Sequence, residues 1–277
     1  MRDDVRDYLA DLVERARGVL GDDLTGGYAA GSVGLGAYHP GRSDVDVALL
    51  VAGPVPAAAK RALVDRLRHE ALPCPARGLE LVVYRRDVAA SGTPEPGFEV
   101  ELNTGAAMAF RATFDPADRP AADGRFWYAL DRSILRQSGL ALLGAPAADV
   151  FADPSPAALR ALLVDALRWW LARPTPPGDG PAPGAEDAVL GACRALVRHR
   201  DGVWLGKVDA GLRVAATDPD AALIRASIAA RRGAPPPAGP AARAFQRRVL
   251  SCLTAGGDPP DRPGRTGDGI RVGSGGW

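Results

Sequence analysis

Apolar residues recur every three or four positions over residues 1–20, which is the spacing of one buried helix face. A short apolar stretch covers residues 24–30, and the continuous apolar run Val45–Val51 has the length of a β-strand. Residues 57–71 again show helical spacing, and residues 79–84 read as another strand. The order strand, turn, strand, helix and strand predicts a compact α/β domain in the first hundred residues.

Helical spacing dominates the second half of the chain. Residues 98–103 still extend the sheet, and residues 128–139 then begin a helical pattern. Residues 173–185 are rich in proline and glycine and predict a rigid loop. Further helices are predicted over residues 157–172, 188–200, 207–216, 221–232 and 241–253.

These elements predict an α/β + all-α protein. We expect an N-terminal α/β domain over residues 1–150 and a C-terminal helical bundle over residues 151–254. Residues 255–277 are rich in Gly, Pro, Asp and Arg without periodicity, which predicts a disordered tail.

Composition narrows the classes of function. The 277 residues carry 34 Lys and Arg against 33 Asp and Glu, and a net charge of +1 gives no electrostatic reason to expect a nucleic-acid partner. No apolar run is long enough to cross a membrane, and no secretory signal pattern opens the chain. The three cysteines are scattered, as in a reducing compartment. We expect a cytoplasmic monomer with no nucleic-acid or membrane partner.

The candidate chemistry begins between residues 31 and 46. At Gly31 and Ser32, backbone N–H groups and a hydroxyl can hold a phosphate, because no bulky side chain blocks its approach. Asp44 and Asp46 open the next strand, and the two-residue period points both carboxylates to one face. Adjacent carboxylates repel unless a cation lies between them, and Mg²⁺ prefers oxygen ligands.

Glu80 adds a third carboxylate inside an otherwise apolar strand. If its strand neighbours that of Asp44 and Asp46, two carboxylates can hold metal while the third accepts a proton from an attacking hydroxyl. Taken singly, an Asp-x-Asp pair is usually solvated turn chemistry, and Glu80 could face water on an edge strand. The joint pattern of both strands indicates a metal and nucleotide site.

The segment from Gly31 to Asp46 resembles the signature of the DNA-polymerase-β-like nucleotidyltransferase superfamily. The chain to about residue 255 is similar to the aminoglycoside (streptomycin/spectinomycin) 3″-adenylyltransferases. The likeness includes Leu79-Glu80-Leu81, Ala129-Leu130-Asp131, the run from Leu140 to Pro146, and the Trp-loop-helix pattern after Trp170. The fold that this implies is a polymerase-β-like domain with a mixed sheet, followed by the helical bundle.

The resemblance implies ATP-dependent transfer of AMP to a hydroxyl group with release of pyrophosphate. Asp44 and Asp46 would bind two Mg²⁺ ions, with Glu80 at the same centre as the general base. The resemblance assigns the remaining nucleotide contacts to Gly31, Ser32, Ser43, Asp131, Arg194 and Lys207.

The acceptor implied is an aminoglycoside-like antibiotic, which calls for an acidic cleft with aromatic walls. Trp170, Asp179 and Asp187 are the candidates for it. The first two lie in a stretch similar to the family's substrate loop, whereas Asp187 is slightly displaced from the family's acidic position. Trp169 is expected in plain packing. Here the loop after Trp170 is longer and richer in proline than in the family. The pair Arg231-Arg232 is expected on a solvated face.

Two other functions use the same chemistry. One is nucleotidyl transfer to a different small molecule, in natural-product tailoring or self-protection. The other is a toxin-type enzyme that modifies a protein or tRNA, which the near-neutral charge disfavours.

Overall fold

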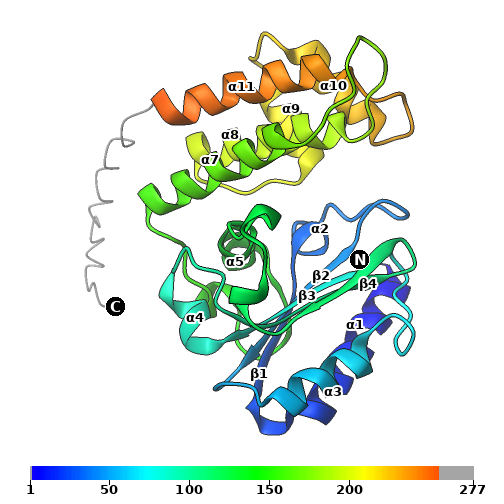
Figure 1. The fold of residues 1–277 in the computed structure, drawn as a ribbon, viewed down its shortest axis with the longest axis vertical. Coiled ribbons are helices and arrows are strands. Elements are labelled where there is room, and N and C mark those ends of the chain that lie inside the picture. Colours follow the sequence, from blue (N-terminus) through cyan, green and yellow to red (C-terminus); the bar gives the residue numbers. More distant parts are fainter. Residues whose placement is uncertain (1, 256–277) are drawn as a thin grey trace, which may run out of the picture.

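The structure, a computed structural model, describes residues 2–255 of the chain. Its base is a six-stranded sheet in the order β5-β4-β3-β2-β1-β6 (Figure 1). Only the β2–β3 pair is parallel among these strands, so the sheet is mixed, as predicted. The strands are β1 (Leu24–Ala29), β2 (Val45–Val51), β3 (Leu79–Arg85), β4 (Phe98–Gly105), β5 (Met108–Thr113) and β6 (Leu140–Leu143).

Two amphipathic helices cover one face of the sheet (Figure 1). In α1 (Asp3–Leu20), the residues at helical spacing that the sequence predicts to be buried, such as Leu9 and Leu12, are fully buried. Helix α3 (Ala57–Leu67) packs beside α1. Helix α3 connects β2 to β3, and such a crossover connection is what allows neighbouring strands to run parallel.

The other face of the sheet carries α5 (Trp127–Ser138), which lies between the sheet and a bundle of helices (Figure 1). Tyr128 and Leu135 of α5 belong to the apolar core above the sheet. Ala129, Leu130 and Ile134 belong instead to the core of the bundle. Helix α5 therefore contributes to two cores at once.

The bundle consists of α7 (Pro156–Ala172), α8 (Ala185–Asp201), α9 (Lys207–Ala215), α10 (Ala221–Ala230) and α11 (Gly239–Ala255). Helix α7 begins where the Ser155 hydroxyl accepts a hydrogen bond from the Ala158 backbone N–H, and Pro156 occupies the first turn. The shorter elements are η1 (Gly21–Asp23), α2 (Gly31–Gly34), α4 (Arg86–Ser91), η2 (Pro116–Asp118), η3 (Ala121–Asp123) and α6 (Ala147–Val150).

The structure confirms the predicted strands and helices with shifts of a few residues at their ends. It adds β5 and β6, which the hydrophobic pattern does not predict because both are short edge strands with exposed positions. The predicted boundary near residue 150 remains a prediction. Of the expected tail, Ala255 is the last residue of α11, and the other residues lie outside the described part of the chain.

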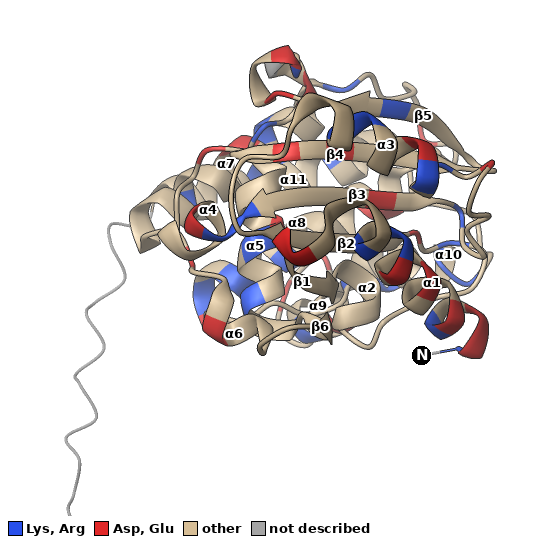
Figure 2. Cartoon of the chain, turned by 90° about the horizontal axis from the view of Figure 1, so that it is seen from below, with Lys and Arg blue, Asp and Glu red and all other residues tan. Residues whose placement is uncertain are grey.

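Acidic and basic residues are interspersed along the elements seen in Figure 2. Among the described residues, no helix is both long and apolar enough to cross a membrane.

Candidate active site

A row of polar side chains crosses four adjacent strands of the sheet. Asp46 of β2 lies opposite Glu80 of β3, Glu80 lies opposite Asn103 of β4, and Asn103 lies opposite Arg111 of β5. Residues in register on neighbouring strands point to the same face of a sheet, and here it is the face toward α5. The parallel pairing of β2 with β3 thus brings together two carboxylates that lie 34 residues apart in the chain.

Gly31 lets the turn after β1 close tightly over Asp46. Its φ is +50°, and a Cβ atom there would lie 1.9 Å from Asp46 Oδ2, so only glycine fits. The Ala30 backbone N–H donates to the Asp46 carbonyl oxygen at 2.9 Å. Ser32 Oγ is buried beside this turn and has no hydrogen-bond partner among the described residues. An unpartnered buried hydroxyl is costly unless a ligand satisfies it, which fits the phosphate contact predicted for Ser32.

Ser43 closes the loop that leads into Asp44. It is buried, and its Oγ accepts a hydrogen bond from the His39 backbone N–H at 3.0 Å. Its own hydroxyl hydrogen remains a possible donor to a ligand. Asp44 follows directly, half-buried, and lines the same cavity as Ser32 and Ser43.

Mutual repulsion and burial dominate the electrostatics at the centre of the row. Burial, followed by the charge of Asp44, raises the pKa of Asp46 to about 7. Burial, followed by the charge of Asp46, raises the pKa of Glu80 to about 8. Asp131 of α5 points toward the same region, and burial raises its pKa to about 6, although its side chain is accessible to solvent within the cleft. A cation placed among these groups would relieve the repulsion.

The carboxylates fit a Mg²⁺ that the protein and a phosphate bind jointly. In residues 2–255, no cluster of three or more His, Cys, Asp and Glu side chains is arranged to hold a metal by itself. Asp44 and Asp46 offer two carboxylates to one cavity, and Mg²⁺ is typically bound by one or two carboxylates while waters and substrate phosphates complete its shell. The donor set therefore suits Mg²⁺ more than a metal that needs a full protein cage.

Two cavities meet at Asp46. The first, of about 480 Å³, lies over the polar row; we call it the sheet cavity, and its far wall includes Trp169, Trp170 and Arg173. The second, of about 720 Å³, is lined by Ser32, Ser43, Asp44 and several cations; we call it the arginine cavity. Asp46, Gly31, Asp131 and Ile134 line both cavities.

The arginine cavity collects cations from distant parts of the chain. Arg42 forms an ion pair with Glu186 at 3.0 Å. The Asp187 carboxylate forms ion pairs with Lys207 at 2.9 Å and with Arg231 at 2.6 Å. Lys207 and Arg194 both line this cavity, and their contact with a nucleotide stays a prediction.

Arg194 has no ion-pair partner among the described residues, unlike Arg42, Lys207 and Arg231 of the same cavity. In the described part of the chain its guanidinium makes no hydrogen bond or ion pair, its Nε is buried without a partner, and it stacks 5.7 Å from the Trp204 ring centroid. Burial lowers its pKa, against the charges of Asp131 and Asp46. A half-buried guanidinium without an ion-pair partner is available to an anionic ligand.

Three of the predicted residues have different surroundings from those expected. Asp187 is bound by two cations of the arginine cavity, so its carboxylate is already neutralised rather than free for a cationic acceptor. The charges of Lys207 and Arg231 outweigh burial and lower its pKa. Asp179 lies in the exposed loop between α7 and α8, outside the set of described residues that line the two cavities. Arg231 belongs to the arginine cavity, so its assignment to a solvated face is wrong.

Trp170, the aromatic residue predicted to contact the acceptor, lines the sheet cavity. Trp169, expected in plain packing, lines the same cavity, while its indole N–H donates to the Ala122 carbonyl oxygen at 2.7 Å. It meets Trp127 and Trp170 edge to face, with ring centroids 5.8 and 5.4 Å away. Both tryptophans therefore form an aromatic wall.

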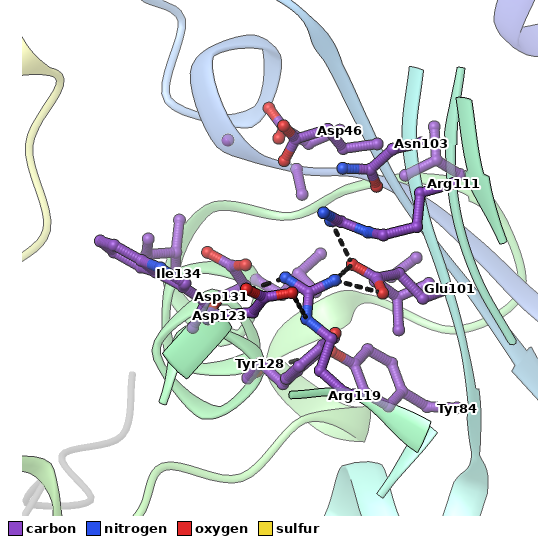
Figure 3. A pocket seen from close by; sticks show the side chains of 18 of the residues that line it. Asp46, Tyr84, Glu101, Asn103, Arg111, Arg119, Asp123, Tyr128, Asp131 and Ile134 are labelled. Carbon is purple, nitrogen blue, oxygen red and sulfur yellow. Dashed lines mark hydrogen bonds and ion pairs between the residues drawn. The ribbon is translucent and has the colours of Figure 1, made fainter. Parts of the chain in front are cut away.

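Sequence reasoning missed the ion pairs beneath this wall. Figure 3 shows Arg119 extended toward Glu101, whose two oxygens each lie 2.5 Å from Arg119 Nη1, and Arg111 approaches the same carboxylate at 2.9 Å. Glu101 and Arg119 are buried. The alternation of Glu101 and Asn103 with apolar neighbours in this strand is the signal that could have found this polar row.

The chain shares its fold with an adenyltransferase of known structure. The match is to spectinomycin adenyltransferase AAD(9) from Enterococcus faecialis, solved with ATP and spectinomycin, with a TM-score of 0.65 and 14% sequence identity. It covers 90% of this chain and 99% of that chain. No family model matches the sequence, and no curated protein matches it. The predicted fold with a mixed sheet and many helices is therefore confirmed, while its division into two domains stays a prediction.

Proposed function

We propose that this protein is an ATP- and Mg²⁺-dependent nucleotidyltransferase that transfers AMP to a hydroxyl group of a small molecule and releases pyrophosphate. The observation that most supports this proposal is the position of Asp46 and Glu80, side by side where the arginine cavity meets the sheet cavity. A nucleotide in one cavity and an acceptor in the other would meet at these carboxylates. The fold shared with AAD(9) supports the same chemistry.

The protein's own groups suit an in-line displacement. Glu80 accepts the proton of the acceptor hydroxyl as its oxygen bonds to the α-phosphorus, and the bond to the bridging oxygen of pyrophosphate breaks. Asp44 and Asp46, with Glu80 at the same centre, are proposed to hold two Mg²⁺ ions. Bound Mg²⁺ neutralises charge on the reacting phosphates.

We assign the nucleotide to the arginine cavity. Its cations can neutralise a triphosphate, and the unpaired guanidinium of Arg194 is the clearest candidate among them. Lys207 and Asp131 are proposed nucleotide contacts on the bundle side and on α5. Ser32, with its buried unpartnered hydroxyl, and Ser43 are proposed contacts on the sheet side, next to Gly31.

The first candidate for the acceptor is an aminoglycoside-like antibiotic of the streptomycin or spectinomycin type, because AAD(9) was solved with spectinomycin and Trp170 offers an aromatic face. Such an enzyme would act as a resistance protein. We propose that it works as a cytoplasmic monomer, with small molecules as its only partners. Free thiols at Cys74, Cys193 and Cys252 suit that compartment.

A different small-molecule acceptor, in tailoring or self-protection chemistry, is the second candidate. Three guanidinium groups line the sheet cavity, from Arg111, Arg119 and Arg173. Glu101 pairs with Arg111 and Arg119, and four further carboxylates line the same cavity, so Arg173 is the one of the three whose charge stays unpaired among the described residues. A positive group placed beside Arg173 would be repelled, which favours an acceptor without positive charge at that wall.

Pyrophosphate release from ATP and Mg²⁺, measured over a panel of antibiotics and other hydroxylated metabolites, tests the proposal. The matched control is Glu80→Gln, which keeps the size of the side chain and should retain ATP binding while turnover falls by about 10²–10⁴-fold. Near-normal turnover in that variant would contradict the role of Glu80. An unmodified chain that neither binds ATP nor releases pyrophosphate would contradict the proposed function.

A further inference from the structure

Arg173 covers the aromatic wall of the sheet cavity with this chain's own positive charge. It is the residue directly after α7, and its guanidinium carbon lies 4.2 Å from the Trp169 ring centroid and 5.6 Å from that of Trp170. All three side chains line the cavity, and Arg173 is exposed at its rim. The face on which a cationic ligand group would stack is therefore already occupied by a cation.

The hydrogen-bond donors of Arg173 remain free. In the described part of the chain, its guanidinium makes no hydrogen bond or ion pair, whereas those of Arg111 and Arg119 are both bound to Glu101. Stacking on an indole uses the flat face of a guanidinium and leaves its in-plane N–H groups available. That edge presents paired donors in the geometry of a carboxylate or phosphate.

The main chain holds Arg173 in this position. Arg243 of α11 donates from Nη1 to the Arg173 carbonyl oxygen at 3.0 Å and to Thr175 Oγ1 at 2.9 Å, and its Nη2 bonds the Leu171 carbonyl. These bonds tie the end of α7 to α11. Arg173 is thus presented by a fixed helix end rather than by a free loop.

We infer that the acceptor carries an anionic group, such as a carboxylate, phosphate or sulfate, which binds the edge of Arg173 at the Trp169–Trp170 wall. An ammonium or guanidinium group in the same place would meet a like charge and an occupied aromatic face. This inference rests on the proposed nucleotidyl transfer and refines its substrate class. The acceptor is then a hydroxyl compound with a negative charge at the end remote from the reacting hydroxyl.

Calorimetric titration of the full chain with two glycosides tests the inference. Phenyl β-D-glucuronide and phenyl β-D-glucoside share the ring and the sugar hydroxyls, and differ in a carboxylate against a hydroxymethyl group. Mg²⁺ and α,β-methylene-ATP, which cannot release pyrophosphate, fill the nucleotide side. We expect the glucuronide to bind about tenfold more tightly than the glucoside, as a charge-assisted pair of hydrogen bonds would give.

Variants of Arg173 show whether that residue causes the preference. Arg173→Gln should reduce it to about twofold or less, and Arg173→Lys should keep part of it, because lysine retains the charge but not the paired donors. Arg168→Gln, which removes an exposed arginine of α7 that pairs with Asp165, is the matched control and should change nothing.

Equal affinities for the two glycosides in the unmodified chain, an unchanged preference in Arg173→Gln, or failure of both glycosides to bind would each overturn the inference. The titration needs no turnover, so its result is separate from the test of the proposed function. A chain that prefers the glucuronide yet releases no pyrophosphate with any acceptor would contradict the nucleotidyl transfer and leave Arg173 as an anion-binding residue.

Discussion

Gln137 holds the backbone of Trp204 with both ends of its side-chain amide. Nε2 donates to the Trp204 carbonyl oxygen at 2.7 Å, and Oε1 accepts from the Trp204 N–H at 2.6 Å. One turn earlier on α5, Ser133 Oγ accepts from the Trp204 indole N–H at 2.9 Å. Because α9 begins at Lys207, three residues after Trp204, this contact ties the backbone leading into Lys207 to α5.

Gln137→Ala should therefore weaken ATP binding. Loss of two hydrogen bonds, each contributing about 1 kcal/mol, frees the segment that carries Lys207. We expect the KM for ATP to rise about tenfold, with a smaller fall in kcat. Gln137→Glu keeps the acceptor oxygen but loses the donor, so its KM should be intermediate. Equal ATP affinity in all three chains, measured by calorimetry, would show that the contact only supports the fold.

The carboxylates at the centre of the site should make the metal-free protein less stable as pH rises. The pKa of Asp46 is raised from 3.8 to about 7, and that of Glu80 from 4.5 to about 8. Between the unfolded and folded pKa values the folded chain holds more protons, so the free energy of unfolding falls as pH rises through this window. The destabilisation is absent at low pH and complete above the folded pKa values.

Thermal unfolding in EDTA at several pH values measures this effect, with Glu80→Gln as the comparison. The variant lacks one charge of the cluster, so its melting temperature should exceed that of the unmodified chain by about 3 °C above pH 8, and the gap should close near pH 5. Adding Mg²⁺ with ATP should raise the melting temperature of the unmodified chain. A gap that does not vary with pH would mean that Glu80 is not destabilised by its neighbours.

Asp187→Asn should act on the nucleotide rather than on the acceptor. Its carboxylate holds Lys207 and Arg231 together, and without that charge the two cations repel each other and lose their common anchor. We expect the KM for ATP to increase about fivefold to tenfold, since a charged hydrogen bond is removed from each cation, while the KM for the acceptor stays within about twofold. A rise in the KM for the acceptor with an unchanged KM for ATP would instead support the acceptor contact that the sequence predicts for Asp187.

Glu101→Gln should destabilise the sheet side of the cleft. Arg119 is buried, and its Nη1 has Glu101 as its carboxylate partner, with Asp123 more distant at 3.8 Å from Nε. Removing one partner of a buried ion pair leaves the other charge uncompensated, which costs about 3–5 kcal/mol. Urea unfolding checks this value. Thr113→Val, which removes a hydroxyl that donates to the same carboxylate, should cost about 1 kcal/mol.

The residues that the sequence could predict are those whose position depends on local pattern. Asp46 and Glu80 each interrupt an apolar strand, and the two strands of a βαβ unit are commonly adjacent in the sheet. The proximity of the two carboxylates therefore follows from the alternation within each strand together with the order of the elements. The turn at Gly31 is likewise local. A glycine directly after a strand predicts that the backbone there passes close to a neighbouring group, which here is Asp46.

The residues that it could not predict come together through the packing of distant elements. Lys207 and Arg231 reach Asp187 from 20 and 44 residues away, and nothing in the helical spacing specifies that meeting. Arg119 lies in a segment with no periodicity, so its burial against Glu101 has no signal in the pattern. Trp169 and Trp170 are adjacent on a helix, and that both line a cavity depends on how α7 packs against α5.

Helix α5 has its two sides in two different cores, and this has a consequence for how the protein can be divided. A fragment ending near residue 150 would expose Ala129, Leu130 and Ile134, and the remaining bundle would lack the residues that fill this part of its centre. Each half would then expose an apolar surface to solvent and would tend to aggregate. The two halves should consequently unfold in a single thermal transition. Neither half should fold when it is expressed alone or fused to a different domain.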